Sequence, residues 1–227
     1  MTVWSFGCSH AAGHELQLDL TQQDMLAFYH KNGFKDWYDL WNCTNEKKKS
    51  KFYKKWEKQL GRNDHDLNLA YPSIVAKLKD TELKNYAMSG SGIDYSYNQF
   101  LKNKKHIKQN DIVLFELPPT LRYQGSTGKR IQVAHTSTSR VIQEYIPNSF
   151  ILEEFYKLVV NEIKDLAYCI HIYCKTADQI MLNVHKSNSI SLHEMSEKYN
   201  YVRYPYSHFH YDTHKLFAEY LVKEVIK

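Results

Sequence analysis

The stretch TVWSFGCSH, residues 2–10, decides the fold of this chain. Its first five residues are mostly β-branched or aromatic, and Gly7 follows them. This pattern is typical of a short buried strand that stops at a tight turn. We therefore expect a strand that delivers Ser9 directly to one edge of a sheet.

Three more strand-like runs follow, at residues 84–88, 111–117 (DIVLFEL) and 166–174 (LAYCIHIYC). Helical patterns alternate with the strands, at residues 20–29, 71–83, 95–104, 151–164 and 213–225. Such alternation of apolar runs and helices is typical of a parallel sheet with both faces covered. The sequence therefore predicts an α/β fold with a parallel sheet of about five strands and helices on both faces.

The length of 227 residues suits one domain with a full hydrophobic core. No linker rich in Pro, Gly or Ser divides the chain. The alternation of strands and helices is interrupted at about residues 34–66, where Trp37 and Trp41 precede a lysine-rich segment. We interpret this stretch as a helical and loop insertion in a single domain that spans residues 1–227.

Composition narrows the class of protein. The net charge of +5 comes largely from lysine runs, which a solvated surface explains better than phosphate binding, so we expect no nucleic-acid partner. The four cysteines form no C-x-x-C pair. No window approaches the ~20 apolar residues of a membrane span, and the first strand leaves no room for a leader peptide ahead of it. We expect a cytoplasmic protein.

Small, polar or titratable residues follow the expected strands. They are Cys8, Ser9 and His10 after the first, SGSG at residues 89–92 after the second, and PPTLR at 118–122 after the third; HFHYDTH at 208–214 leads into the last helix. Functional groups of open parallel sheets gather at the carboxyl ends of the strands. A serine needs an adjacent base to become a nucleophile, and glycine lets a backbone N–H approach an oxyanion closely. These segments therefore contain the parts of an acyl-transfer site.

The same residues resemble a known family. FGCSH at residues 6–10 is similar to the F-G-D-S-L block of the SGNH (GDSL-type) hydrolases, and NYAMSGSG at 85–92 to their N-x-x-x-S-G block. DIVLFELPPT matches the strand of their third block, and Asp212-Thr213-His214 resembles the closing Asp/His block. With Thr120 and Arg122 after the third strand, the chain looks like a divergent phage-type or bacterial member.

The resemblance implies a three-layer, flavodoxin-like fold and an ester hydrolase, such as one that removes acetyl groups from carbohydrates, without cofactor or metal. Ser9 would be the nucleophile, His214 its base and Asp212 the orienter of His214. Gly90 and Thr120 would serve the oxyanion hole, and Arg122 the substrate. The chain departs from the family at Cys8, which replaces an Asp, and at Thr120, which replaces an Asn.

Three other interpretations stay open. The same cleft could bind a carbohydrate or nucleotide without catalysis. Ser9 and Asp212 could simply be helix N-caps. A metal site could use the histidines and the aspartate near the C-terminus together with two histidines near the N-terminus, namely His208, His210, His214, Asp212, His10 and His14.

Overall fold

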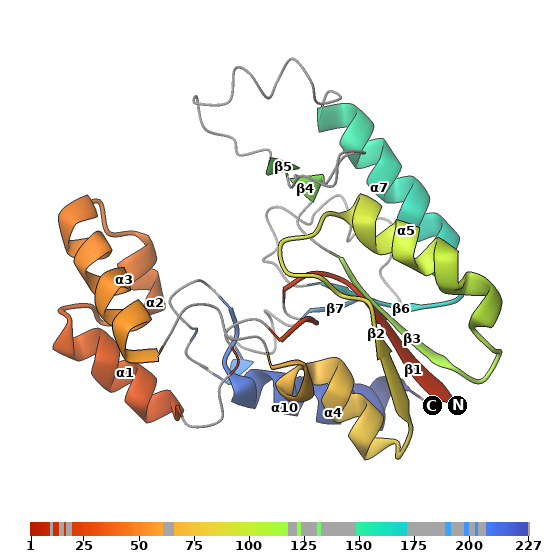
Figure 1. Ribbon diagram of the computed structural model, residues 1–227, viewed down its shortest axis with the longest axis horizontal. Helices are drawn as coiled ribbons and strands as arrows, with labels where there is room; N and C mark the ends of the chain where they lie inside the picture. The colour runs from red at the N-terminus through yellow and green to blue at the C-terminus, as the bar shows by residue number, and fades with distance from the viewer. Residues whose placement is uncertain are drawn as a thin grey trace.

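The computed structural model describes residues 1–9, 11–13, 16, 20–60, 66–117, 122–123, 131–132, 149–171, 189–191, 198–199, 203 and 208–226. Its centre is a parallel sheet with the strand order β2-β1-β3-β6-β7 (Figure 1). These strands are β1 (Thr2–Phe6), β2 (Glu82–Asn85), β3 (Ile112–Leu117), β6 (Tyr168–His171) and β7 (Ser189–Ser191). The predicted α/β class with a parallel sheet is therefore confirmed.

Side chains alternate between the two faces of the sheet, as the period of a strand requires. Val3 and Leu114 point into a core shared with α4 (Tyr71–Leu78) and α10 (Tyr211–Tyr220). Trp4 and Phe115 point into a second core shared with α5 (Ile93–Asn103) and α7 (Ser149–Ile163). Helices thus cover both faces (Figure 1), and every residue of β3 is buried, as expected for a central parallel strand.

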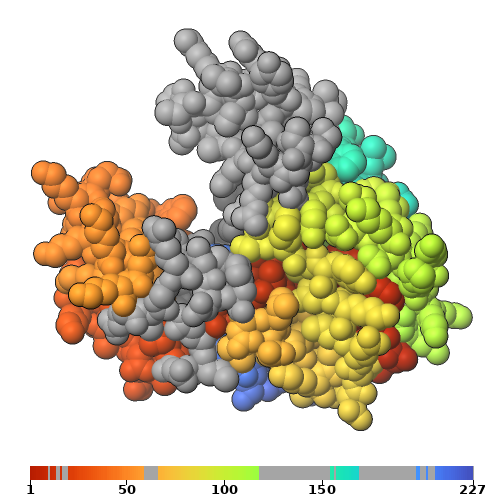
Figure 2. Space-filling model, viewed as in Figure 1, coloured from red at the N-terminus to blue at the C-terminus, as the bar shows by residue number. Residues whose placement is uncertain are grey.

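Three helices between β1 and α4 build a core of their own. They are α1 (Gln22–Lys31), α2 (Trp37–Trp41) and α3 (Glu46–Leu60). Thr21 and Asp24 form a capping box at the start of α1, and Asp36 caps α2. This core extends from Leu16 to Ala70, so it begins earlier than the insertion expected at 34–66. The three helices protrude to one side of the sheet (Figures 1 and 2).

Some boundaries differ from the prediction. The second strand was expected at 84–88 but pairs with β1 at Glu82–Asn85. The helix expected at 71–83 ends at Leu78, because Lys79 and Asp80 form a turn in which Asp80 has a φ of 48°. Short elements complete the described chain: η1 (Leu67–Leu69), η2 (Lys104–His106), η3 (Leu221–Val225) and the hairpin β4 (Arg122–Tyr123) with β5 (Ile131–Gln132). No helix in these residues is both long and apolar enough to cross a membrane.

Candidate active site

Ser9 lies just beyond the carboxyl end of β1. The amide of Ala12 donates to the carbonyl of Cys8 at 3.0 Å, which closes one helical turn around Ser9. The serine is only 4% exposed, and its Oγ lies 4.0 Å from the Sγ of Cys8. The amides of Ala11 and Ala12 are bound by Glu116 and Cys8, so Ser9 does not serve them as an N-cap.

The segment after β2 packs against the same end of β1. The carbonyl of Gly7 accepts hydrogen bonds from the Met88 amide at 3.1 Å and from the Ser91 hydroxyl at 2.9 Å. The Ser91 amide donates to the carbonyl of Met88 at 3.0 Å, which closes a tight turn. Gly90 is the third residue of this turn and has a φ of 73°, a conformation that favours glycine. The sheet therefore brings the turns of Ser9 and Gly90 to one edge, as the sequence predicts.

Two backbone N–H groups at this edge lack an acceptor among the residues that the structure describes. Within the described residues, neither the N–H of Ser9 nor that of Gly90 has a hydrogen-bond acceptor. Backbone N–H groups almost always find partners in folded proteins or bind water. Backbone N–H groups of this kind are what stabilises an oxyanion.

Glu116 is a site residue that the sequence analysis missed. It belongs to β3, is fully buried, and accepts hydrogen bonds from the Cys8 amide at 3.2 Å and the Cys8 thiol at 2.8 Å. Tyr71 also donates to it through its hydroxyl, at 3.2 Å. Burial raises the pKa of Glu116, while the hydrogen bonds from Cys8, Ala11 and Tyr71 oppose that rise. The signal in the sequence was a single acidic residue inside the apolar run DIVLFEL.

His214 is buried on the first turn of α10. Its Nδ1 accepts the backbone N–H of Tyr71 at 3.2 Å, so in the neutral ring the proton lies on Nε2. Burial, together with the nearby His208 and His210, lowers the pKa of His214 to about 3. No hydrogen bond joins Ser9 to His214 in the described part of the chain. That His214 takes the proton of Ser9 stays a prediction.

The side chain of Asp212 contacts His210, and its expected role as the orienter of His214 stays a prediction. Its Oδ2 lies 3.3 Å from Nδ1 of His210, and its side chain is 45% exposed. The two residues are i and i+2 on α10, and side chains at this spacing do not face each other on a helix. Asp212 is not the N-cap, because His210 caps α10 by accepting the Asp212 amide.

Comparison with known proteins shows a similarity of fold and no similarity to a known family. No family model matches the chain, and no curated protein matches it. Among solved structures, it resembles a carbohydrate esterase whose active site is described as having divergent catalytic and non-catalytic binding functions. The TM-score is 0.51, with 16% identity over 99% of this chain and 66% of the esterase. The chain thus spans about two thirds of that structure. It has an esterase-like fold.

Several predicted residues lie outside what the structure describes. Thr120, His10 and His14 are not among the described residues. Arg122 pairs with Gln132 between β4 and β5, but only its main chain is described. In the described residues, no group of three or more His, Cys, Asp or Glu side chains is arranged to hold a metal ion.

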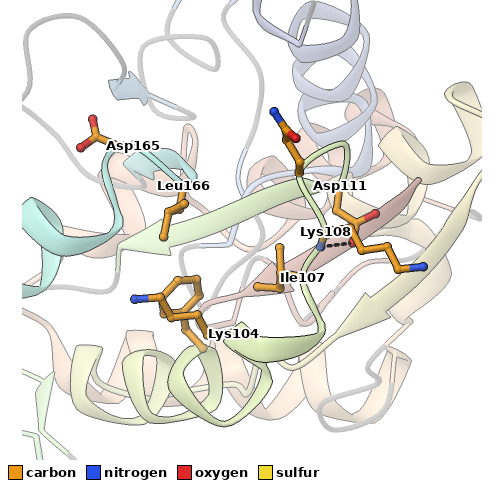
Figure 3. A pocket seen from close by; sticks show the side chains of 8 residues that line it. Lys104, Ile107, Lys108, Asp111, Asp165 and Leu166 are labelled. Atoms are coloured by element: carbon orange, nitrogen blue, oxygen red, sulfur yellow. Dashed lines mark hydrogen bonds between the residues drawn. The ribbon is translucent and has the colours of Figure 1, made fainter.

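A pocket of about 430 Å³ lies at the opposite end of the sheet. Two of its lining residues lie just before strands: Asp111 immediately precedes β3, and Leu166 lies two residues before β6. Ser9, in contrast, follows β1. Figure 3 shows the labelled lining residues and the hydrogen bond from the Lys108 amide to Asp111, 3.0 Å long. This pocket is therefore separate from the candidate active site.

Proposed function

We propose that this chain is a serine ester hydrolase with a three-layer, SGNH-type fold, and that Ser9 is its nucleophile. The observation that carries the proposal is that the N–H groups of Ser9 and Gly90, in two turns held together through the Gly7 carbonyl, have no acceptor among the described residues, while Ser9 itself is buried. The esterase-like fold supports it. The proposed substrate is a small acyl ester, first of all an acetyl group on a carbohydrate hydroxyl.

The proposed reaction has two steps and needs no cofactor. Ser9 Oγ attacks the ester carbonyl while a histidine takes its proton, and the N–H groups of Ser9 and Gly90 bind the negative oxygen of the tetrahedral intermediate. The C–O bond to the sugar then breaks, and the histidine returns the proton to the leaving alcohol. Water, activated by the same histidine, hydrolyses the acyl-enzyme and releases the carboxylic acid.

The base is a histidine of residues 208–214. His214 is the residue implied by the SGNH resemblance, but it would have to exchange its Nε2 proton and its bond to Tyr71 before Nε2 could accept a proton. His208 is only half-buried and lies close enough to His214 to affect its pKa. We therefore assign the base to His208 first and keep His214 as the alternative.

Thr120 and Arg122 remain part of the proposal. Thr120 would supply a third donor to the oxyanion through its hydroxyl or amide. Arg122, on the β4–β5 hairpin, would contact an oxygen of the substrate. Replacing either should lower the activity without abolishing labelling of Ser9, because neither activates the serine.

Covalent labelling tests the proposal. A fluorophosphonate reacts with an activated serine, and peptide mapping identifies the residue that it modifies. We expect labelling of wild type at Ser9 and none in Ser9→Ala. Ser91→Ala is a matched control, because Ser91 belongs to the same edge but its hydroxyl is bound to Gly7. Folded wild type that does not react, or reacts equally after Ser9→Ala, would disprove a Ser9 hydrolase.

A second candidate is a non-catalytic module that binds a carbohydrate or nucleotide in the same cleft. The observation that favours it is the bond from Tyr71 to Nδ1 of His214, in place of the carboxylate of a catalytic triad. Calorimetric titration with acetylated and deacetylated oligosaccharides distinguishes the two candidates. A binding module would hold both ligands unchanged, whereas a hydrolase would convert the first into the second.

A further inference from the structure

Glu116 connects the Ser9 turn to the helix that follows η1. Its Oε1 accepts both the amide and the thiol of Cys8, and the Ala11 amide also donates to this carboxylate. Cys8 and Ala11 lie on either side of Ser9 in sequence. A single carboxylate therefore holds the backbone before and after the proposed nucleophile.

Tyr71 continues this connection to His214. Its hydroxyl donates to Oε2 of Glu116 at 3.2 Å, and its own backbone N–H donates to Nδ1 of His214 at 3.2 Å. Tyr71 is the first residue of α4 and is fully buried. The ring of Tyr71 also lies 5.8 Å from the imidazole of His214. A continuous set of hydrogen bonds thus runs from the Ser9 turn through Glu116 and Tyr71 to His214.

A buried carboxylate is a costly way to join two elements. Its desolvation is unfavourable, and an apolar side chain of similar volume often stabilises a core equally well. Every other residue of β3 is apolar, so Glu116 is the exception in that strand. Hydrogen bonds differ from apolar contacts in fixing direction, and fixed direction matters where reacting groups must be aligned.

We propose that Glu116 is a positioning residue, which through Tyr71 holds the Ser9 turn and the His214 ring in one fixed arrangement. The effect on reactivity rests on the proposed function, because it assumes that Ser9 is the nucleophile. The structural part, that His214 depends on Glu116, does not.

Tyrosine variants offer a matched test. Tyr71→Phe removes only the hydroxyl that reaches Glu116. Tyr29→Phe is the control, because Tyr29 is equally buried and its hydroxyl donates to the carbonyl of Arg203 at 2.9 Å, in the core of α1–α3. Urea unfolding should show similar losses of stability for the two. Fluorophosphonate labelling of Ser9 should slow at least about 10-fold in Tyr71→Phe and about 100-fold in Glu116→Gln, but stay at the wild-type rate in Tyr29→Phe.

Nitrogen-15 NMR of the histidine rings supplies a readout that is independent of catalysis. We expect the His214 ring signals to shift in Glu116→Gln and Tyr71→Phe and to stay unchanged in Tyr29→Phe. Equal labelling rates in the two tyrosine variants, or wild-type labelling of Glu116→Gln, would overturn the proposal. If wild type itself is not labelled, the proposed function fails; unchanged His214 signals would then overturn the positioning role as well, and shifted signals would support its structural part.

Discussion

The Nδ1 atom of His214 lies 3.2 Å from the backbone nitrogen of Tyr71, although 143 positions separate the two residues in the chain. This bond joins the start of α4 to the first turn of α10, the two helices that cover one face of the sheet. The amide of Tyr71 belongs to the first turn of its helix, where no intrahelical acceptor exists. His214 therefore completes the hydrogen bonding of α4.

Two substitutions of His214 should show how much its role as a hydrogen-bond acceptor contributes to stability. In His214→Asn, the side-chain oxygen can take the place of Nδ1 and accept the Tyr71 amide. His214→Leu leaves that buried amide without an acceptor, which typically costs about 1–3 kcal/mol. We expect His214→Leu to unfold at lower urea concentration than His214→Asn. Equal midpoints would show that the bond contributes nothing to stability.

Acid should destabilise the protein through His214. The folded-state pKa of His214 is lowered to about 3 from its ordinary value of 6.5, so between these values only the unfolded chain binds the proton. The contribution of His214 to the free energy of unfolding should therefore be complete above about pH 6.5. Below that pH it should fall by about 1.4 kcal/mol for each pH unit. Urea unfolding at pH 4.5, 5.5 and 6.5 measures the slope. His214→Asn should have the shallower slope, and parallel slopes would contradict a buried neutral His214.

The choice of base predicts a difference between two histidines. His208→Ala should slow labelling of Ser9 by about 10²–10⁴-fold, the usual contribution of a general base. His214→Asn should slow it less than about 10-fold, because the asparagine preserves the bond to Tyr71. Circular dichroism on both variants checks that they fold. The reverse order of the two effects would return the base to His214.

The absence of a side chain at Gly7 lets the end of β1 approach β3 closely beside Ser9. A Cβ on Gly7 would lie 2.5 Å from Cβ of Glu116, so Gly7→Ala must displace the carboxylate. We expect a loss of about 1–3 kcal/mol in stability, together with slower labelling of Ser9. Gly33→Ala is the control: its φ of 78° also makes alanine unfavourable, but its Cβ would meet only the Lys48 side chain. If Gly33→Ala slowed labelling as much as Gly7→Ala, general destabilisation would explain both.

The central strands were predictable because their sequences are continuous apolar runs. β1 and β3 are buried on both faces, and the hydrophobic pattern alone indicates such strands. β2 has the sequence ELKN and is half-exposed at the edge of the sheet, so its position depended on pairing with β1. β7 spans only three residues, Ser189–Ser191, with one apolar side chain among them. Its position in the sheet is set by parallel pairing with β6, which the sequence pattern alone does not indicate.

The position of the candidate site was predictable from the sequence, but the hydrogen bonds between its residues were not. The sequence indicated which segments meet at the carboxyl edge, because that follows from a parallel sheet. It did not indicate that Glu116, within an apolar strand, would bind the Ser9 turn, since this contact joins residues 108 positions apart. The short spacing of Asp212 and His214 suggested a pair, but the helix begins at Tyr211 and turns their side chains apart.

Asp212→Asn tests the predicted role of Asp212 directly. An aspartate that fixes the tautomer of a catalytic histidine can contribute about 10⁴-fold to turnover. Here the carboxylate contacts His210 from a half-exposed position, and such pairs contribute about 0–1 kcal/mol. We expect the labelling rate of Ser9 in Asp212→Asn to stay within about twofold of wild type, and stability to change by no more than about 1 kcal/mol. Lys223→Gln, which alters the exposed ion pair of Lys223 with Glu224, provides a surface control. A loss of labelling by several orders of magnitude in Asp212→Asn alone would mean that this carboxylate reaches a catalytic histidine during the reaction.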